Sequence, residues 1–186
     1  VSGEIMQTLR RGSANVSRAD YQRIIDLKTA ELFHVSCFLG ARLAGSAPGY
    51  VEAASRFGRH LGIAYQIYDD LADFFGEETR VGKTLGTDLA SGKLTLPLFL
   101  LIDRLPAAAR DELMAEITGQ RPVQAGLHFQ QMRELGIFDG VASAVLAETK
   151  LATDALQPWP NEAPTPLLLS LGDVLQAQVA ALRPSS

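Results

Sequence analysis

The chain has 186 residues, of which 47% are hydrophobic and 20% charged, an ordinary globular composition that excludes a disordered chain. Its net charge of −4 argues against a nucleic-acid-binding protein, because such a protein needs a basic face. No stretch reaches the ~20 apolar residues that a bilayer-spanning helix requires, and no basic-then-apolar leader is present, so we expect neither a membrane span nor a signal peptide.

The first long helix is predicted to begin after Ser17, because Ser17 and Asp20 have the spacing of a capping box. Apolar residues then recur every three or four positions and form one stripe: Tyr21, Ile24, Ile25, Leu27, Leu32, Phe33 and Val35. The helix should run to about residue 44, where a Gly-Ser-Ala-Pro sequence interrupts it. Cys37 lies among apolar neighbours, which predicts a buried thiol and, as the single cysteine, fits a reducing cytoplasm.

A second helix is predicted over 48–76, with Pro48 suited to its first turn. The following segment, 76–92, contains four glycines among polar residues and is predicted to be a long functional loop. Further helices are predicted by their apolar periodicity over 94–105, 107–118, 121–135, 138–156 and 165–182. Because no alternating strand pattern occurs, we expect residues 1–186 to form a single all-α domain.

Three carboxylates end the second helix: Asp69, Asp70 and Asp73. Their spacing places them on one side of a helix with Cβ atoms ~5–6 Å apart. A solvated acidic patch is at least as common an explanation of this pattern taken alone. The surrounding helix is apolar, however, and clustered acids in such a setting repel one another unless a cation neutralises them. Oxygen ligands of this kind suit Mg2+.

Lysines supply the complementary charge. Lys83 and Lys93 each follow a glycine in the loop, where backbone can approach a ligand closely and lysine can bind phosphate; two exposed loop lysines are the alternative. Lys28 and Thr29 interrupt the first apolar helix, although a lysine can also extend along a helix surface to water. Gln66, one turn before Asp70, is either a core amide or a site residue.

Taken in order, three blocks resemble the second half of the trans-polyprenyl diphosphate synthase family. They are KTAELF at 28–33, GIAYQIYDDLAD at 62–73, and the GK…D…GKLTLP segment at 82–97. The resemblance implies an isoprenoid-synthase-type helical bundle that lacks its N-terminal helices. The family's first aspartate-rich motif and its Gly-Gly-Lys-Arg element are absent from this sequence, so we expect a fragment of a protein about twice as long that is inactive alone.

The resemblance also implies roles for individual residues. The residues matching the second aspartate-rich motif, which holds Mg2+ against an allylic diphosphate, are Asp69, Asp70 and Asp73. The residues matching positions that contact the diphosphate are Lys28, Lys83 and Lys93. The residues matching positions that face the developing carbocation are Thr29 and Gln66. The implied reaction joins the allylic diphosphate to isopentenyl diphosphate, and a homodimer is the implied assembly.

Two other functions stay open at this stage. A non-catalytic subunit of a heteromeric synthase would not need the aspartates and lysines. A terpene synthase or head-to-head condensing enzyme also uses aspartate-rich helices but lacks the run at 82–97. The scattered histidines have no metal-ligand spacing and are predicted to be structural: His34, His60 and His128.

Overall fold

The computed structural model describes residues 2–76 and 85–184, and every regular element within these ranges is helical. The first half contains α1 (Ser2–Leu9), α2 (Arg18–Ile25), η1 (Asp26–Ala30), α3 (Glu31–Leu43) and α4 (Pro48–Phe75). The second half contains α6 (Thr87–Ala90), α7 (Leu96–Arg104), α8 (Ala107–Ile117), α9 (Ala125–Glu134), α10 (Ile137–Leu156) and α11 (Thr165–Ala181). The predicted all-α class is confirmed.

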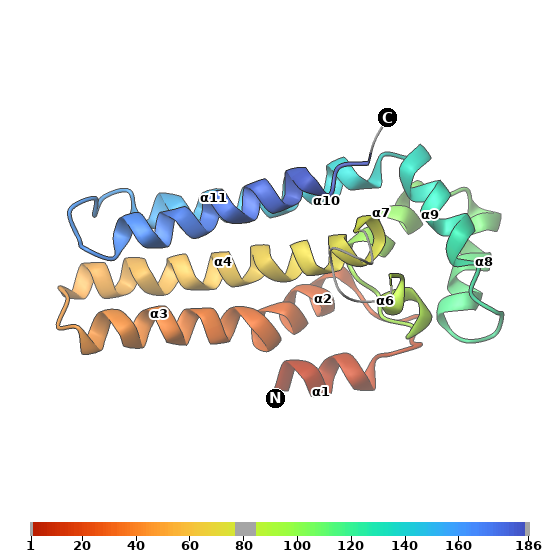
Figure 1. Cartoon of the computed structure of the whole chain (residues 1–186). Coiled ribbons are helices and arrows are strands. Elements are labelled where there is room, and N and C mark those ends of the chain that lie inside the picture. The colour runs from red at the N-terminus through yellow and green to blue at the C-terminus, as the bar shows by residue number, and fades with distance from the viewer. Residues whose placement is uncertain (1, 77–84, 185–186) are drawn as a thin grey trace.

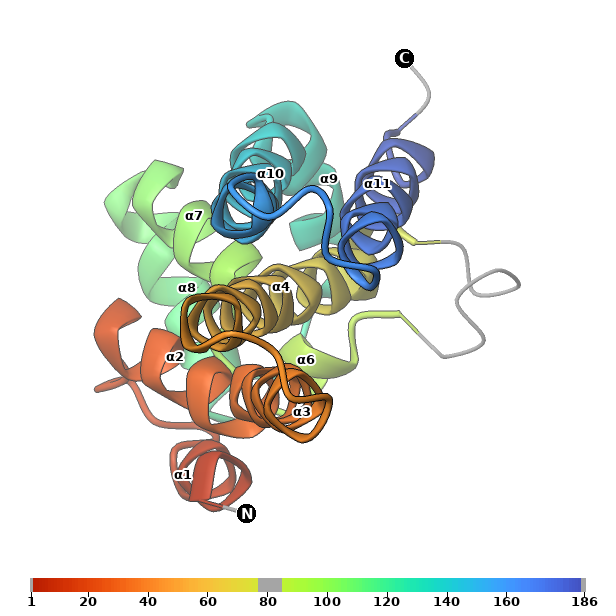
Figure 2. The ribbon, with the colours of Figure 1, turned by 90° about the vertical axis from the view of Figure 1, so that its left-hand side faces the viewer.

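Helix α4 is the central element of the bundle (Figure 1). It packs against α10 on one side and α3 on the other, and α11 in turn covers α10. Viewed end on, α4 lies in the middle of the surrounding helices (Figure 2). Its apolar periodicity explains this position, because the largest buried side chains along it, Tyr50, Phe57 and Leu71, are fully enclosed. The shorter helices α7, α8 and α9 gather around the end where α4 stops (Figure 1).

The first predicted helix begins as expected but is not a regular α-helix throughout. The capping box is present: the Asp20 amide donates to Ser17 Oγ at 3.1 Å, and the Ser17 amide donates to Asp20 Oδ2 at 3.0 Å. Between α2 and α3, however, residues 26–30 form a π-helical turn. Such turns widen the helix locally and are frequent at functional sites. This one contains Lys28 and Thr29.

Glycines allow the helices around this turn to approach closely. A Cβ at Gly62 of α4 would lie 2.6 Å from the Ala30 Cα, and one at Gly58 would lie 2.5 Å from the Phe33 carbonyl oxygen. On the other side of the turn, a Cβ at Gly3 of α1 would lie 2.4 Å from the Lys28 amide nitrogen. No side chain fits at these points, so the π-turn is held between α1 and α4 by backbone contact.

The apolar stripe of the first helix divides into two parts. Its early members, such as Tyr21 and Ile24, are buried, whereas Leu32 is 68% exposed and Val35 is also exposed. The prediction of one continuous stripe was therefore wrong. The π-turn adds a residue to one turn and rotates the side chains that follow it. The rotated apolar side is not covered by any part of the chain that the structure describes.

The remaining predicted helices agree with the structure apart from their ends, whereas residues 77–84 of the loop predicted over 76–92 lie outside the described residues. The helix predicted from residue 94 begins at Leu96, after extended Thr95, and the helix predicted from residue 121 begins at Ala125. Helices α1 and α6 were not predicted, because each is too short for a periodic pattern. Of the described helices, none combines the length and apolarity that crossing a membrane requires.

Candidate functional site

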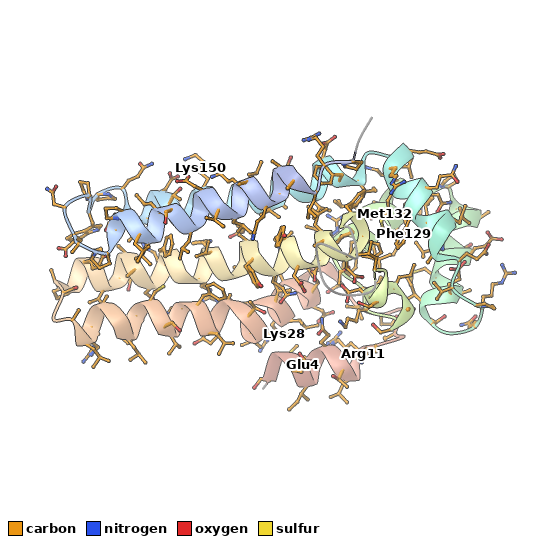
Figure 3. The ribbon with its side chains drawn as sticks, in the orientation of Figure 1. Glu4, Arg11, Lys28, Phe129, Met132 and Lys150 are labelled. Carbon is orange, nitrogen blue, oxygen red and sulfur yellow. The ribbon has the colours of Figure 1, made fainter. Side chains whose placement is uncertain are left out.

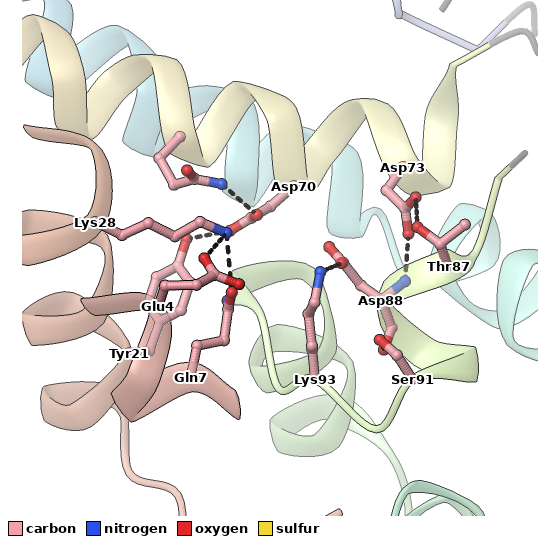
Figure 4. A network of polar contacts seen from close by, with 11 residues as sticks. Glu4, Gln7, Tyr21, Lys28, Asp70, Asp73, Thr87, Asp88, Ser91 and Lys93 are labelled. Carbon is pink, nitrogen blue, oxygen red and sulfur yellow. Dashed lines mark hydrogen bonds and ion pairs between the residues drawn. The ribbon is translucent and has the colours of Figure 1, made fainter. Parts of the chain in front are cut away.

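The candidate site lies at the C-terminal end of α4 and is centred on Asp70. This side chain is buried, and its two oxygens accept hydrogen bonds from Tyr21 Oη at 2.6 Å and Gln66 Nε2 at 3.1 Å (Figure 4). Burial and the nearby charge of Asp88 raise the pKa of Asp70 to about 8, although the two donors oppose the shift. Asp70 is therefore a carboxyl group whose ionised form needs additional positive charge.

Thr29 and Gln66 are brought together as a hydrogen-bonded pair. Thr29 Oγ1 donates to Gln66 Oε1 at 2.6 Å, while the amide nitrogen of Gln66 donates to Asp70. The pairing fixes the orientation of the Gln66 amide, because its oxygen faces a donor and its nitrogen faces a carboxylate. The close contact at Gly62 allows the π-turn to reach α4 here. Both residues were predicted as site residues, and the structure links them to the aspartate cluster.

Asp73 connects the end of α4 to the loop that follows. Its carboxylate oxygens accept hydrogen bonds from Thr87 Oγ1 at 2.8 Å and from the Asp88 amide at 2.9 Å. The Gly86 amide also donates to the Asp73 carbonyl at 2.8 Å. Asp73 thus anchors the short helix α6, and the prediction that it binds a metal stays a prediction.

Lys93 and Asp88 form an ion pair next to this anchor. Lys93 Nζ lies 2.7 Å from Asp88 Oδ1, and the Lys93 amide donates to the Asp88 carbonyl at 2.9 Å. Burial raises the pKa of Asp88, and the Lys93 ammonium works against that shift. Sequence reasoning assigned no role to Asp88, and only its position between the two Gly-Lys pairs marked it.

Lys28 extends from the π-turn toward the same region (Figure 4). Its ammonium group lies 2.9 Å from Gln7 Oε1 and 3.1 Å from Glu4 Oε2, both on α1. The hydrogen bond from Lys28 lowers the pKa of Glu4, so that this acid stays ionised as a counter-charge. Figure 4 shows Lys28 and Lys93 approaching the aspartate side of α4 from two directions.

Asp69 and Asp70 are oxygen donors of the kind that a hard divalent cation prefers. Asp69 is half-exposed, and its charge adds to the larger effects of burial and of Asp88 that raise the pKa of Asp70, so a bound cation would offset part of this shift. Among the described residues, no three His, Cys, Asp or Glu side chains form a ready-made metal-binding group. Mg2+ usually takes one or two carboxylates and completes its shell with water and phosphate oxygens, so two ligands suffice.

Most of the predicted site residues are thereby collected at one end of the bundle. Lys83 lies outside the described residues. Tyr21 was predicted only as a core residue, and no local signal marks it as a donor to Asp70. The three histidines each lie 2.8–3.3 Å from a glutamate side chain, and their structural role stays a prediction. Cys37 is half-buried, and burial raises the pKa of its thiol, which fits an unreactive side chain.

Comparison with known proteins identifies the family to which the chain belongs. The family model of the polyprenyl synthetases matches residues 1–134, and the chain belongs to this family. The octaprenyl diphosphate synthase of Haemophilus influenzae is 32% identical over 171 residues, which cover 91% of this chain and 52% of that protein. An all-trans-nonaprenyl-diphosphate synthase of Rhodobacter capsulatus is 31% identical, with the same coverage. The chain thus spans about half the length of these curated relatives.

Solved structures agree with this assignment. A polyprenyl synthase from Caulobacter crescentus, crystallised with calcium and isoprenyl diphosphate, superposes with a TM-score of 0.88 at 30% identity, over 95% of this chain and 54% of that one. A decaprenyl diphosphate synthase from Rhodobacter capsulatus gives a TM-score of 0.82 at 29% identity, over 98% and 56%. The helical arrangement described above is therefore that of the polyprenyl synthases, over about half of their length.

Proposed function

We propose that this chain supplies the allylic diphosphate site of an isoprenyl diphosphate synthase. The whole enzyme would join an allylic diphosphate to isopentenyl diphosphate and release a longer trans-polyprenyl diphosphate. The observation that carries the proposal is the convergence of Asp70, Lys28 and Lys93 from separate segments at one end of the bundle. The names of the relatives support the reaction class.

The two lysines would bind the diphosphate and stabilise it as a leaving group. In the structure their ammonium groups are held by Glu4 and Asp88, so they are already directed and need not be ordered when the substrate arrives. Asp69 and Asp70 would hold Mg2+, which would add positive charge against the departing diphosphate. Asp73 would keep the loop with Lys93 in place.

Departure of the diphosphate breaks a C–O bond and leaves an allylic cation. The double bond of isopentenyl diphosphate attacks this cation to form the new C–C bond, and loss of a proton restores a double bond. Thr29 and Gln66, held in one orientation by their mutual hydrogen bond, would face the cation with their dipoles. The apolar helices around them would exclude water, which otherwise captures the cation.

Substitution of the central aspartate tests the proposal. We expect Asp70→Ala to abolish Mg2+-dependent binding of geranyl diphosphate, measured by isothermal titration calorimetry. Asp111→Ala removes an exposed acid from α8 and is the matched control, which should bind like the wild type. Circular dichroism of both variants shows whether they are folded. A folded Asp70→Ala variant that binds geranyl diphosphate with the affinity of the wild type would contradict the assignment.

The assembly is a second part of the proposal. A homodimer is our prediction, whereas one relative, from Geobacillus stearothermophilus and 41% identical over 108 residues, is named heptaprenyl diphosphate synthase component 2. The aspartates and lysines argue for a catalytic rather than a non-catalytic chain in either assembly. Sedimentation of the purified protein distinguishes a self-associating chain from one that needs a different subunit.

A further inference from the structure

A buried acid–base pair joins α8 to α9, separate from the carboxylates of α4. His128 Nε2 lies 2.8 Å from Glu116 Oε2, and the two side chains are only 3% and 1% exposed. The same glutamate accepts a hydrogen bond from the Gln124 amide at 2.9 Å, and His128 Nδ1 lies 2.9 Å from Gln131 Oε1. These contacts fix the connection between the two helices.

The residue that follows each member of the pair contacts the segment 85–93, which carries Asp88 and Lys93 and is called the site loop below. Ile117 presents its carbonyl to Gly92, where a Cβ would lie 2.8 Å from that oxygen. Phe129 presents its ring to Gly86, where a Cβ would lie 2.9 Å from Cζ. The ring of Phe129, which is labelled in Figure 3, also packs edge to face on Phe74 near the end of α4, at 5.9 Å between centroids.

The two glycines lie on either side of Asp88, the residue that holds Lys93 in an ion pair. Gly86 and Gly92 both adopt left-handed backbone conformations, with φ of 71° and 66°. Asp88 and Lys93 lie between and beside them and are bonded to each other through side chain and backbone. Any shift of α9 or of the end of α8 must therefore move the loop or open a gap beneath it, because packed interiors have little free space.

We propose that Glu116 and His128 are positioning residues for the diphosphate site. They hold the end of α8 and the start of α9 against Gly92 and Gly86, and through these contacts they fix the position of Lys93. Burial alone would raise the pKa of Glu116, but its hydrogen bonds from Gln124 and His128 outweigh burial and lower it, so Glu116 stays ionised. Removing one member leaves the other buried without its partner, which lowers the stability of the folded protein.

That the site loop binds diphosphate rests on the proposed function. The effect of the Glu116–His128 pair on the site loop can be measured without a ligand. Hydrogen–deuterium exchange of the 85–93 segment, followed by mass spectrometry, should be faster in Glu116→Gln than in the wild type. His60→Gln is the matched control, since it breaks another histidine–glutamate contact of 2.8 Å, to Glu148, that joins α4 to α10. This control should leave exchange in 85–93 unchanged. Unchanged exchange in Glu116→Gln as well would overturn the inference.

Binding of inorganic diphosphate with Mg2+ provides the second measurement. We expect Glu116→Gln to weaken it roughly 10-fold, the size of effect that outer-shell partners of metal sites have, and His60→Gln to leave it unchanged. Phe129→Leu keeps the pair but loosens the contact with Gly86, and should act in the same direction even if Glu116→Gln does not fold. A wild type that fails to bind contradicts the proposed function, whereas equal binding by wild type, Glu116→Gln and Phe129→Leu contradicts only the positioning role.

Discussion

Replacement of Tyr21 by phenylalanine isolates one hydrogen bond of the site. The Tyr21 ring is buried and packs edge to face on Phe99, and phenylalanine keeps that contact. The hydroxyl stays a donor at neutral and alkaline pH, because burial and the charge of Asp70 raise its pKa well above the ordinary value. The substitution therefore removes the 2.6 Å bond to Asp70 and leaves a buried carboxyl oxygen unsatisfied.

Loss of a partner for a buried polar group costs about 2 kcal/mol. For a chain of this size the melting temperature should then fall by roughly 4–8 °C. Urea unfolding followed by circular dichroism measures the free energy directly. Tyr65→Phe is the control, since Tyr65 is half-exposed on α4 and should change stability by less than about 0.5 kcal/mol. If Tyr21→Phe were as stable as this control, the hydrogen bond to Asp70 would not contribute as argued.

Two further changes test the packing and the buried pair. Gly62→Ala should lower the free energy of unfolding by about 1–3 kcal/mol, because its Cβ would lie 2.6 Å from the Ala30 Cα. Gly40→Ala is the control, since its Cβ would meet nothing within 4 Å, and it should raise the free energy of unfolding by about 0.5–1 kcal/mol. Equal melting temperatures of the two variants would refute the close approach at Gly62. The lowered pKa of Glu116 stabilises the fold above the ordinary value of 4.5, and this contribution is lost as pH falls through the lowered value. Urea midpoints measured at pH values down to about 3 should therefore fall more steeply for the wild type than for Glu116→Gln, and parallel curves would contradict the shift.

The long helices could be predicted because their cores are periodic and their ends carry local signals. Ser17 begins α2 with its capping box, and Pro48 begins α4 in its first turn. The π-turn over 26–30 could not be predicted, because no local pattern distinguishes it from a regular helical turn. It depends on Gly3 and Gly62, which are far from it in sequence and let α1 and α4 close on it.

The site was predicted in its residue types but not in its connections. The spacing of Asp69, Asp70 and Asp73 placed them on one side of α4, yet it did not show that Asp73 would turn to the loop and anchor α6. The hydrogen bond from Tyr21 to Asp70 joins residues 49 positions apart, which periodicity does not address. Partners of this kind depend on how helices pack, and only the folded structure supplies that information.

The central claim is that this chain holds an allylic diphosphate through Mg2+ and its lysines. The most direct test is calorimetric titration of the wild-type protein with geranyl diphosphate, once with Mg2+ and once with EDTA. We predict saturable binding with Mg2+ that is lost in EDTA. Equal binding in both titrations, or binding in neither by a protein that circular dichroism shows to be folded, would contradict the claim.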